Sequence, residues 1–355
     1  PFYVDSNLVR FRNGYPTKIG GWEQQIYYTN VDTTTEALAQ GKPKKALFWR
    51  SDTDGSDRIA LGTHNHLYII LNGVLHDITP LRKTSTNLSN PLVTVQNSTT
   101  ITVTDSSHGA KNGDFIVIQQ ATAVGGISTD TLNRAEGYAI TVIDSNSYSI
   151  QSPTQATSGA TGGGTGLDVE YLIGRDAQMN IESADTATGW GVGTWGLSTW
   201  GTARDVDSDT ISLEATKWSL QLWGEDLLAS NRNGQIYYWD TSTGESTRAS
   251  LVSALGGASG VPTKNRDIAI SFPDRHLIVG GTTLLGTTNQ DPMLIRFSDQ
   301  EDFTNFTPTS TNTSGDQRLE VGNKIVSIVP SKSETIINTD EACYGMTFVG
   351  PPFTF

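Results

Sequence analysis

Closely spaced carboxylates are the first groups in this 355-residue chain that could do chemistry. Asp52, Asp54 and Asp57 surround Gly55, and oxygen ligands spaced around a glycine are typical of calcium loops. The group is short and lacks the downstream bidentate glutamate of such loops. An Asp-Gly pair between two apolar segments also predicts a hairpin turn, which is the interpretation we favour.

Other candidate metal ligands also occur in groups that lack one or more of the residues a metal site needs. Asp205, Asp207 and Asp209 raise the same two alternatives, calcium loop or turn. His64 and His66 alternate along one strand face, and two histidines at that spacing could hold zinc, but no third ligand of matching spacing follows. A structural histidine pair is the preferred interpretation, and we predict no metal site.

The segment 298–306 contains several acidic residues and is similar to the aspartate turn of sialidase-type propellers, although it lacks the central glycine of that turn. Paired carboxylates can cleave glycosidic bonds, whereas acidic residues in a turn after a strand are also common in proteins without activity. The chain contains no nucleophile elbow, P-loop or dinucleotide fingerprint. We therefore predict no catalytic residues, no cofactor and no enzymatic activity.

Three Trp-Gly pairs recur at a spacing of five residues, at Trp190, Trp195 and Trp200. This spacing matches neither the 3.6-residue period of a helix nor the two-residue period of a strand. It indicates an extended, turn-broken segment that presents indole rings at intervals. Tryptophan anchors both cores and protein interfaces, so the rings either pack at one end of a β-rich core or form an assembly surface.

Composition narrows the class of protein. The formal net charge is −13 and the pI about 4.7, so tight binding to a nucleic-acid backbone is not expected. Cys343 is the single cysteine, which excludes a disulfide framework or a thiolate metal cluster. No run of about 18 apolar residues predicts a membrane span, and no leader predicts secretion.

Strand and turn signals dominate the chain. Residues 8–12, Asn13-Gly14 and Tyr15 onward predict a hairpin with Pro16 in an edge or short strand. Units of short apolar strands joined by polar turns recur about every 45 to 60 residues, as expected for propeller blades. They lie at residues 46–78, 218–239, 267–297 and 324–346.

The predicted fold class is all-β, a β-propeller with an inserted small β-barrel or β-sandwich module. We divide it into residues 1–82 (N-terminal hairpin and first blade or blades), 83–166 (inserted module) and 167–355 (remaining blades). The stretches 83–91 and 157–166 read as linkers flanking the insertion. Residues 350–355 read as the start of more structure, so the ring is completed either by further residues or by the N-terminal hairpin.

Several of these segments resemble one family. The opening stretch 5–22, the segments 59–64 and 77–82, the Trp-Gly ribbon and residues 291–302 are similar to tail proteins of tailed bacteriophages. The likeness is to the nozzle or tail-hub proteins of short-tailed phages, of the tail tubular protein B type and the DNA-stabilisation type. It covers about three quarters of the chain, excludes 83–166, and carries over no catalytic residue.

The resemblance implies a virion structural protein, made in the host cytoplasm, that forms a homohexameric ring below the portal adaptor. Such a head–tail connector contacts tail fibre or tail needle proteins, and it retains genomic DNA and passes it at ejection without specific binding. We expect Trp190, Trp195, Trp200, Arg10 and Arg12 at the contacts between subunits. The alternative is a carbohydrate-binding or glycan-cleaving propeller, such as a receptor-binding tail protein.

Overall fold

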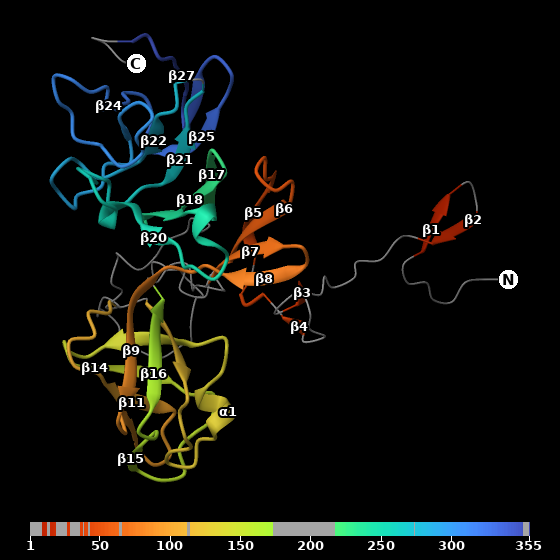
Figure 1. Cartoon of the computed structure of the whole chain (residues 1–355), viewed down its shortest axis with the longest axis vertical. Coiled ribbons are helices and arrows are strands. Elements are labelled where there is room, and N and C mark those ends of the chain that lie inside the picture. Colours follow the sequence, from red (N-terminus) through yellow and green to blue (C-terminus); the bar gives the residue numbers. More distant parts are fainter. Residues whose placement is uncertain are drawn as a thin grey trace, which may run out of the picture.

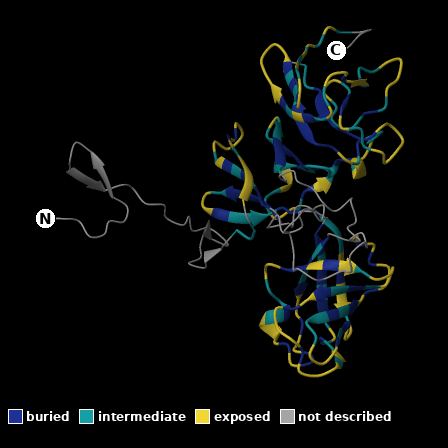
Figure 2. Cartoon of the chain, turned by 180° about the vertical axis from the view of Figure 1, so that it is seen from behind, coloured by how far each residue is buried: buried dark blue, intermediate teal, exposed yellow. Residues whose placement is uncertain are grey.

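The computed structural model describes residues 9–12, 15–18, 27–28, 36–37, 39–41, 43–63, 66–111, 114–172, 217–272, 274–350 and 355. Across these residues the fold is all-β, as predicted: antiparallel sheets predominate, and α1 (Thr129–Leu132) is a single helical turn. Figure 1 shows two bodies, the stacked sheets above and a curled sheet below. Buried residues gather inside each of them (Figure 2).

The upper body consists of four sheets in chain order. The first contains the meander β5 (Pro43–Arg50), β6 (Asp57–Thr63), β7 (Leu67–Leu71) and β8 (Val74–Asp77), extended by β3 (Tyr27–Tyr28) and β4 (Glu36–Ala37). The second contains β17 (Trp218–Trp223), β18 (Asp226–Asn231), β19 (Ile236–Trp239) and β20 (Ser250–Leu251). The third contains β21 (Asp267–Ile270), β22 (Leu277–Gly280), β23 (Leu294–Phe297) and β24 (Gly315–Arg318).

The fourth sheet has three strands, β25 (Ile325–Pro330), β26 (Thr335–Thr339) and β27 (Cys343–Met346). The first strands of the last three sheets lie side by side, β17 against β21 and β21 against β25, while β5 lies against β17. This is the arrangement of blades in a propeller. Among the described residues, no strand pairing joins the fourth sheet to the first.

Turn chemistry explains the meanders. Asn72 and Gly73 both have positive φ, 51° and 80°, and form the two-residue turn between β7 and β8 that the Asn-Gly pair predicts. The predicted N-terminal hairpin is present as β1 (Val9–Arg12) and β2 (Tyr15–Lys18). Its strands pair only with each other among the described residues.

Asp267 ties three sheets together at their first strands. Its buried carboxylate accepts hydrogen bonds from Ser219 on β17, from the backbone N–H of Ile328 on β25 at 3.1 Å, and from Lys217 Nζ at 2.8 Å. Trp218 donates its indole N–H to the Thr63 carbonyl at 2.7 Å and so links the second sheet to the first. The sheets are therefore held by directed polar contacts as well as by apolar packing.

The lower body is one curled eight-stranded sheet in the order β15-β10-β11-β14-β13-β12-β16-β9. Its edge strands β15 and β9 do not pair with each other, so the predicted small β module is a half-barrel that is open between these two strands. The strands are β9 (Leu81–Leu88), β10 (Leu92–Thr94), β11 (Thr100–Thr104), β12 (Phe115–Gln119), β13 (Tyr138–Val142), β14 (Ser147–Gln151), β15 (Ala160–Gly162) and β16 (Leu167–Leu172).

The two predicted linkers were wrong, because both segments contain paired strands. Residues 83–88 belong to β9 and residues 160–162 form β15. The Ser/Thr-rich composition misled the prediction, since β9 is anchored by polar contacts rather than by apolar side chains. Ser85 is buried and donates to Asp105 at 2.5 Å, and Tyr171 donates to the same carboxylate at 2.5 Å.

Candidate functional site

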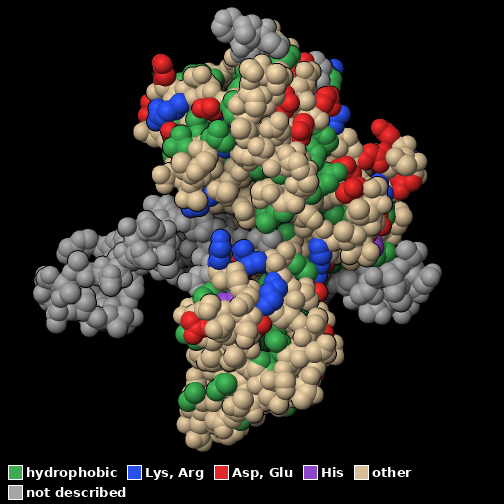
Figure 3. Space-filling model, turned by 60° about the vertical axis from the view of Figure 1, so that its left-hand side comes forward, with side chains coloured by type: hydrophobic (Ala, Val, Ile, Leu, Met, Phe, Trp, Pro, Cys, Tyr) green, Lys and Arg blue, Asp and Glu red, His purple; other side chains and the backbone are tan. Residues whose placement is uncertain are grey.

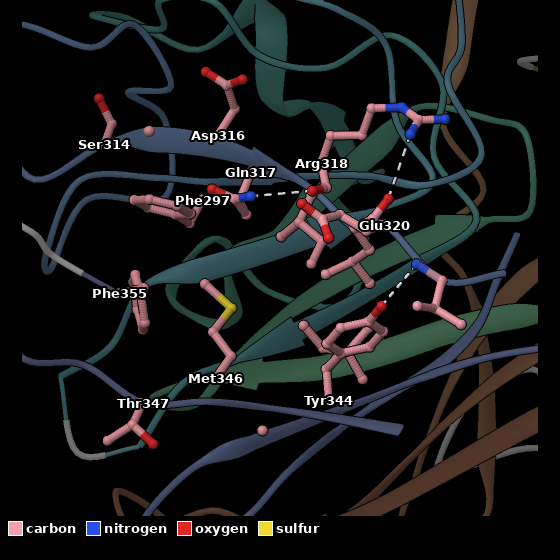
Figure 4. Close-up of a pocket in the computed structure, with 16 residues that line it drawn as sticks. Phe297, Ser314, Asp316, Gln317, Arg318, Glu320, Tyr344, Met346, Thr347 and Phe355 are labelled. Carbon is pink, nitrogen blue, oxygen red and sulfur yellow. Dashed lines mark hydrogen bonds between the residues drawn. The ribbon is translucent and has the colours of Figure 1, made fainter. Parts of the chain in front are cut away.

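One hollow lies between the third and fourth sheets, beside the strands β24 and β27. This groove has a cavity volume of about 850 Å³, and it lies beside a sheet in which three strands are described, where its two predecessors have four. A strand added beyond β27 would face β24 across the space. Figure 4 shows the side chains that surround it.

The floor of the groove is apolar. Phe297 on β23 and Phe355 stack edge to face with ring centroids 4.8 Å apart, and Met346 on β27 lies beside them (Figure 4). Gly315 is needed here, because a Cβ at that position would come within 2.6 Å of the Phe297 ring. The absence of a side chain therefore lets β24 approach the aromatic floor.

The walls of the groove are polar. Asp316 and Glu320 are exposed along the β24 side, while Arg318 is paired through Nε with Asp291 at 2.8 Å. Tyr344 bridges the sheets, because its hydroxyl accepts the backbone N–H of Val321 at 2.8 Å. An apolar floor with a polar rim is typical of a surface that receives another chain.

A smaller hollow of about 370 Å³ lies between the first and second sheets and is lined by residues of the Asp52–Asp57 segment, for which a turn was favoured over a calcium loop. Asp54 accepts hydrogen bonds from Ser56 N–H at 2.9 Å and from the Ser56 hydroxyl at 2.6 Å, and its Oδ2 lies 3.1 Å from Arg58 Nη2. The Ser56 contacts, followed by a hydrogen bond from Ser51 and then by the charge of Arg58, hold the pKa of Asp54 well below its usual range. The segment is thus the turn between β5 and β6, as the favoured interpretation had it.

The remaining carboxylates of this hollow also accept hydrogen bonds from groups of the same chain. Glu225 accepts from the Ser51 hydroxyl at 2.8 Å, which lowers its pKa. Asp226 accepts from Tyr238 at 2.7 Å, and Asp240 accepts from Ser242 N–H at 2.8 Å. The lowered pKa values of Asp54 and Glu225 favour their ionised forms, whereas glycoside hydrolysis needs one carboxyl with a raised pKa.

The sialidase-like segment also uses its carboxylates internally. Asp299 accepts from Thr313 N–H at 2.9 Å and from its hydroxyl at 2.8 Å, and Asp302 accepts from Thr304 N–H at 2.8 Å. Phe306, which follows this turn, is fully buried. Within the described residues, no group of three or more His, Cys, Asp or Glu side chains is arranged to hold a metal ion.

The predicted assembly residues cannot be placed in full. Trp190, Trp195 and Trp200 lie outside the described residues, as do His64, Asp205, Asp207 and Asp209. Arg10 and Arg12 lie on β1, of which the backbone is described. Their role as contact residues stays a prediction.

His66 and His276 have structural surroundings. His66 is buried and stacks on Tyr68 with ring centroids 5.3 Å apart. His276 is fully buried among Phe297, Phe348 and Phe355, and its Nε2 lies 3.0 Å from the Thr313 hydroxyl. Desolvation lowers the pKa of His276, although Asp274 and Asp299 act in the opposite direction.

Sequence reasoning missed the groove and the Asp267 hub. Neither leaves a local signal, because the groove is lined by residues of two sheets and the contacts of Asp267 come from three. The face in Figure 3 shows acidic side chains spread over the stacked sheets and a cluster of Lys and Arg where the curled sheet joins them. No helix in the described part of the chain is long and apolar enough to cross a membrane.

Comparison with known proteins gives little further guidance. No protein-family profile matches the sequence, and no curated protein matches it. Among solved structures, the chain has a likeness to the phage phi92 endosialidase, at 14% sequence identity and a TM-score of 0.24. The match covers 86% of this chain and 44% of that one. A TM-score of this size does not establish a shared fold, so the likeness has no bearing on activity.

Proposed function

We propose that this protein is a non-enzymatic structural subunit of a bacteriophage tail. In this proposal copies of the chain form a ring around the DNA channel, at the nozzle or hub position below the portal adaptor. The ring retains the genome and passes it at ejection. The rest of the assembly, including a six-fold ring and contacts to tail fibres or a tail needle, follows from the sequence resemblance.

The observation that carries the proposal is the fourth sheet, where no described strand pairs with the outer edge of β27, beside an open groove with an apolar floor. Val326 and Val329 on β25 are also 40% and 48% exposed on this sheet. An unpaired edge with exposed apolar side chains is a site of association unless it is protected. The hydrogen-bonded stack of sheets behind it supplies a stiff scaffold for a ring.

Charge supports the conduit role. A net charge of −13 repels the DNA backbone, so a channel built from this chain lets DNA slide without adhering. The carboxylates of the smaller hollow are held by intramolecular donors, which favours a structural role for them. We propose on this basis that the channel wall is rich in Asp and Glu.

The test is the size and shape of the purified protein. We expect ring-shaped particles by light scattering and electron microscopy, and immunolabelling of the tail in virions that carry the gene. A protein that stays monomeric at all concentrations and is missing from tails contradicts the proposal. Binding on a glycan array, or release of sugars from host-surface polysaccharide, favours the carbohydrate-directed alternative instead.

A further inference from the structure

Arg296 is a buried arginine of the third sheet. It lies on β23 and is 2% exposed. Its Nη2 donates to the carbonyl oxygens of Gly260 at 2.7 Å and Phe306 at 2.9 Å, and its Nη1 donates to that of Thr283 at 3.4 Å. A guanidinium has five N–H donors, so these three bonds leave one hydrogen on Nη1 and the hydrogen on Nε without an acceptor among the described residues.

Arg296 also lacks a carboxylate partner in the described part of the chain. Several other arginines have a carboxylate oxygen within 4.0 Å, namely Arg58, Arg82, Arg248, Arg275 and Arg318. The residue opposite Arg296 in the pairing of β23 with β24 is Asp316, and no ion pair within 4.0 Å joins the two. The most deeply buried of these arginines is therefore the one without a counter-ion.

The charge of Arg296 is compensated only in part. Carbonyl dipoles surround the guanidinium, and the ring of Phe306 lies 5.7 Å from its central carbon. Burial lowers the pKa of Arg296, while the charge of Asp316 acts in the opposite direction. A buried charge is costly unless an opposite charge accompanies it, so this position favours an anion from outside the chain.

A hollow of about 310 Å³ borders Arg296. Its other walls come from residues 253–263 and from the loop 283–287 between β22 and β23, and they carry hydroxyl and apolar side chains but no acidic one. By contrast, the hollow between the first and second sheets is lined by four carboxylates. Arg296 Nε lacks an acceptor and is still not a fully buried atom, so it is accessible from the hollow. One arginine without a carboxylate gives this hollow a positive potential in a chain of net charge −13.

We propose that this hollow, which we call the Arg296 pocket, binds a carboxylate group at Nε of Arg296. A carboxylate carries one negative charge, which a single guanidinium matches, and it forms strong hydrogen bonds with guanidinium N–H groups. A phosphate carries up to two charges and three acceptor oxygens, more than two free donors can hold. Val261 and Leu284 border the same space, so a carboxylate on a short apolar stem fits best. The volume is near the lower end for ligand sites, which limits the ligand to a small acid or one acidic side chain.

The same carboxylate chemistry has two sources, a free short-chain acid and a glutamate side chain of another protein. Either one enters through the mouth of the Arg296 pocket, where Ser253 and Leu284 are exposed. The inference does not rest on the proposed ring, because a single subunit contains the whole pocket. Failure of one proposal therefore leaves the other standing.

The test observes Arg296 directly. In isotope-labelled full-length protein, the Nε–H signals of the arginines are followed by NMR while butyrate is added, and Arg296→Lys identifies the Arg296 signal by its loss. We expect this signal to shift saturably with butyrate. Butyramide, the neutral isostere, should bind about tenfold more weakly, or by about 1.4 kcal/mol. No saturable shift, or equal shifts with the amide, overturns the inference.

A matched pair of variants changes the charge at the mouth and leaves Arg296 in place. Ser253 is exposed, and its side chain makes no hydrogen bond to a described residue. Ser253→Asp places a carboxylate beside the ligand and should weaken butyrate binding about tenfold through repulsion and competition for Arg296. Ser253→Asn has nearly the same size without the charge and should bind butyrate like the original protein. Both should keep the original stability, because the position is on the surface. Equal butyrate binding by the two variants overturns the inference.

Two further measurements complete the test. Asp316→Asn removes the carboxylate opposite Arg296 and should tighten butyrate binding, whereas weaker binding overturns the inference. A capped peptide with one glutamate between leucines, and its glutamine counterpart, separate the two sources. Binding of the glutamate peptide about tenfold tighter than butyrate, and lost with glutamine, assigns the pocket to a protein side chain. Equal or weaker binding of the glutamate peptide assigns it to a free acid.

Discussion

At the scale of single residues, buried polar side chains hold the sheets together. Asp267 is 6% exposed and is bonded to groups from β17 and β25 as well as to Lys217. Through these hydrogen bonds, Asp267 links three sheets. Its removal leaves a lysine and two donors without their acceptor, which costs more than the loss of one contact.

We expect Asp267→Ala to lower the free energy of unfolding by about 3 kcal/mol. Asp267→Asn, which keeps the size of the side chain but not its charge, should cost less. The measurement is urea unfolding followed by tryptophan fluorescence. Asp52→Ala, at an exposed position, is the control and should change stability by less than about 0.5 kcal/mol. Equal effects at both positions contradict the conclusion that Asp267 links the sheets.

His276 makes stability depend on pH. Its pKa in the folded protein lies below the ordinary value of 6.5, mainly because burial disfavours the charged ring. The unfolded chain therefore binds more protons as the pH falls below about 6.5, and stability is full above that pH and declines below it. We expect the urea midpoint to fall between about pH 7 and pH 5, before most carboxylates titrate.

His276→Gln removes the titrating group and should flatten part of this decline. His76, whose pKa is also lowered by desolvation, accounts for another part, so His76→Gln provides the comparison. A pH profile that His276→Gln leaves unchanged contradicts the assignment.

At the scale of elements, the curled sheet is a unit with its own core. Its buried apolar residues form one cluster, and its first and last strands are paired, with Leu81 opposite Leu172. One cation connects it to the stacked sheets: Arg248 contacts Asp77 at 2.8 Å and Glu170 on β16 at 2.9 Å.

We expect residues 81–172, expressed alone, to fold cooperatively, because their ends already lie side by side and their core is internal. Circular dichroism and a single unfolding transition are the measurements. The fragment should start at Leu81 and end at Leu172; a fragment of 83–166 cuts into β9 and omits all of β16, so it should be less stable. A molten 81–172 fragment shows that the sheet depends on the upper body.

The strands themselves follow from sequence, and their partners do not. Alternation and the Asn72-Gly73 turn predict the meander β7–β8, because both signals are local. β9 escaped prediction, because its one buried side chain is Ser85, whose acceptor, Asp105, lies on a later loop. Composition alone cannot distinguish such a strand from a linker.

At the scale of the whole molecule, charge predicts behaviour toward DNA. With a net charge of −13, the protein should show no measurable binding to double-stranded DNA at about 0.15 M salt. Fluorescence anisotropy with a labelled duplex is the measurement, and an unrelated basic DNA-binding domain is the positive control. Submicromolar, sequence-independent binding contradicts the conduit role, because DNA would then adhere to the channel.

The sequence by itself determined the all-β class, the four repeated units, the hairpin turns and the acidic character, since each depends on neighbouring residues or on composition. Only the tertiary structure decided which sheets lie side by side, that a groove opens beside β27, and that Asp267 meets three sheets. These features join residues far apart along the chain. They exist only once the sheets pack, because alternation specifies a strand's two faces but not which edge stays unpaired.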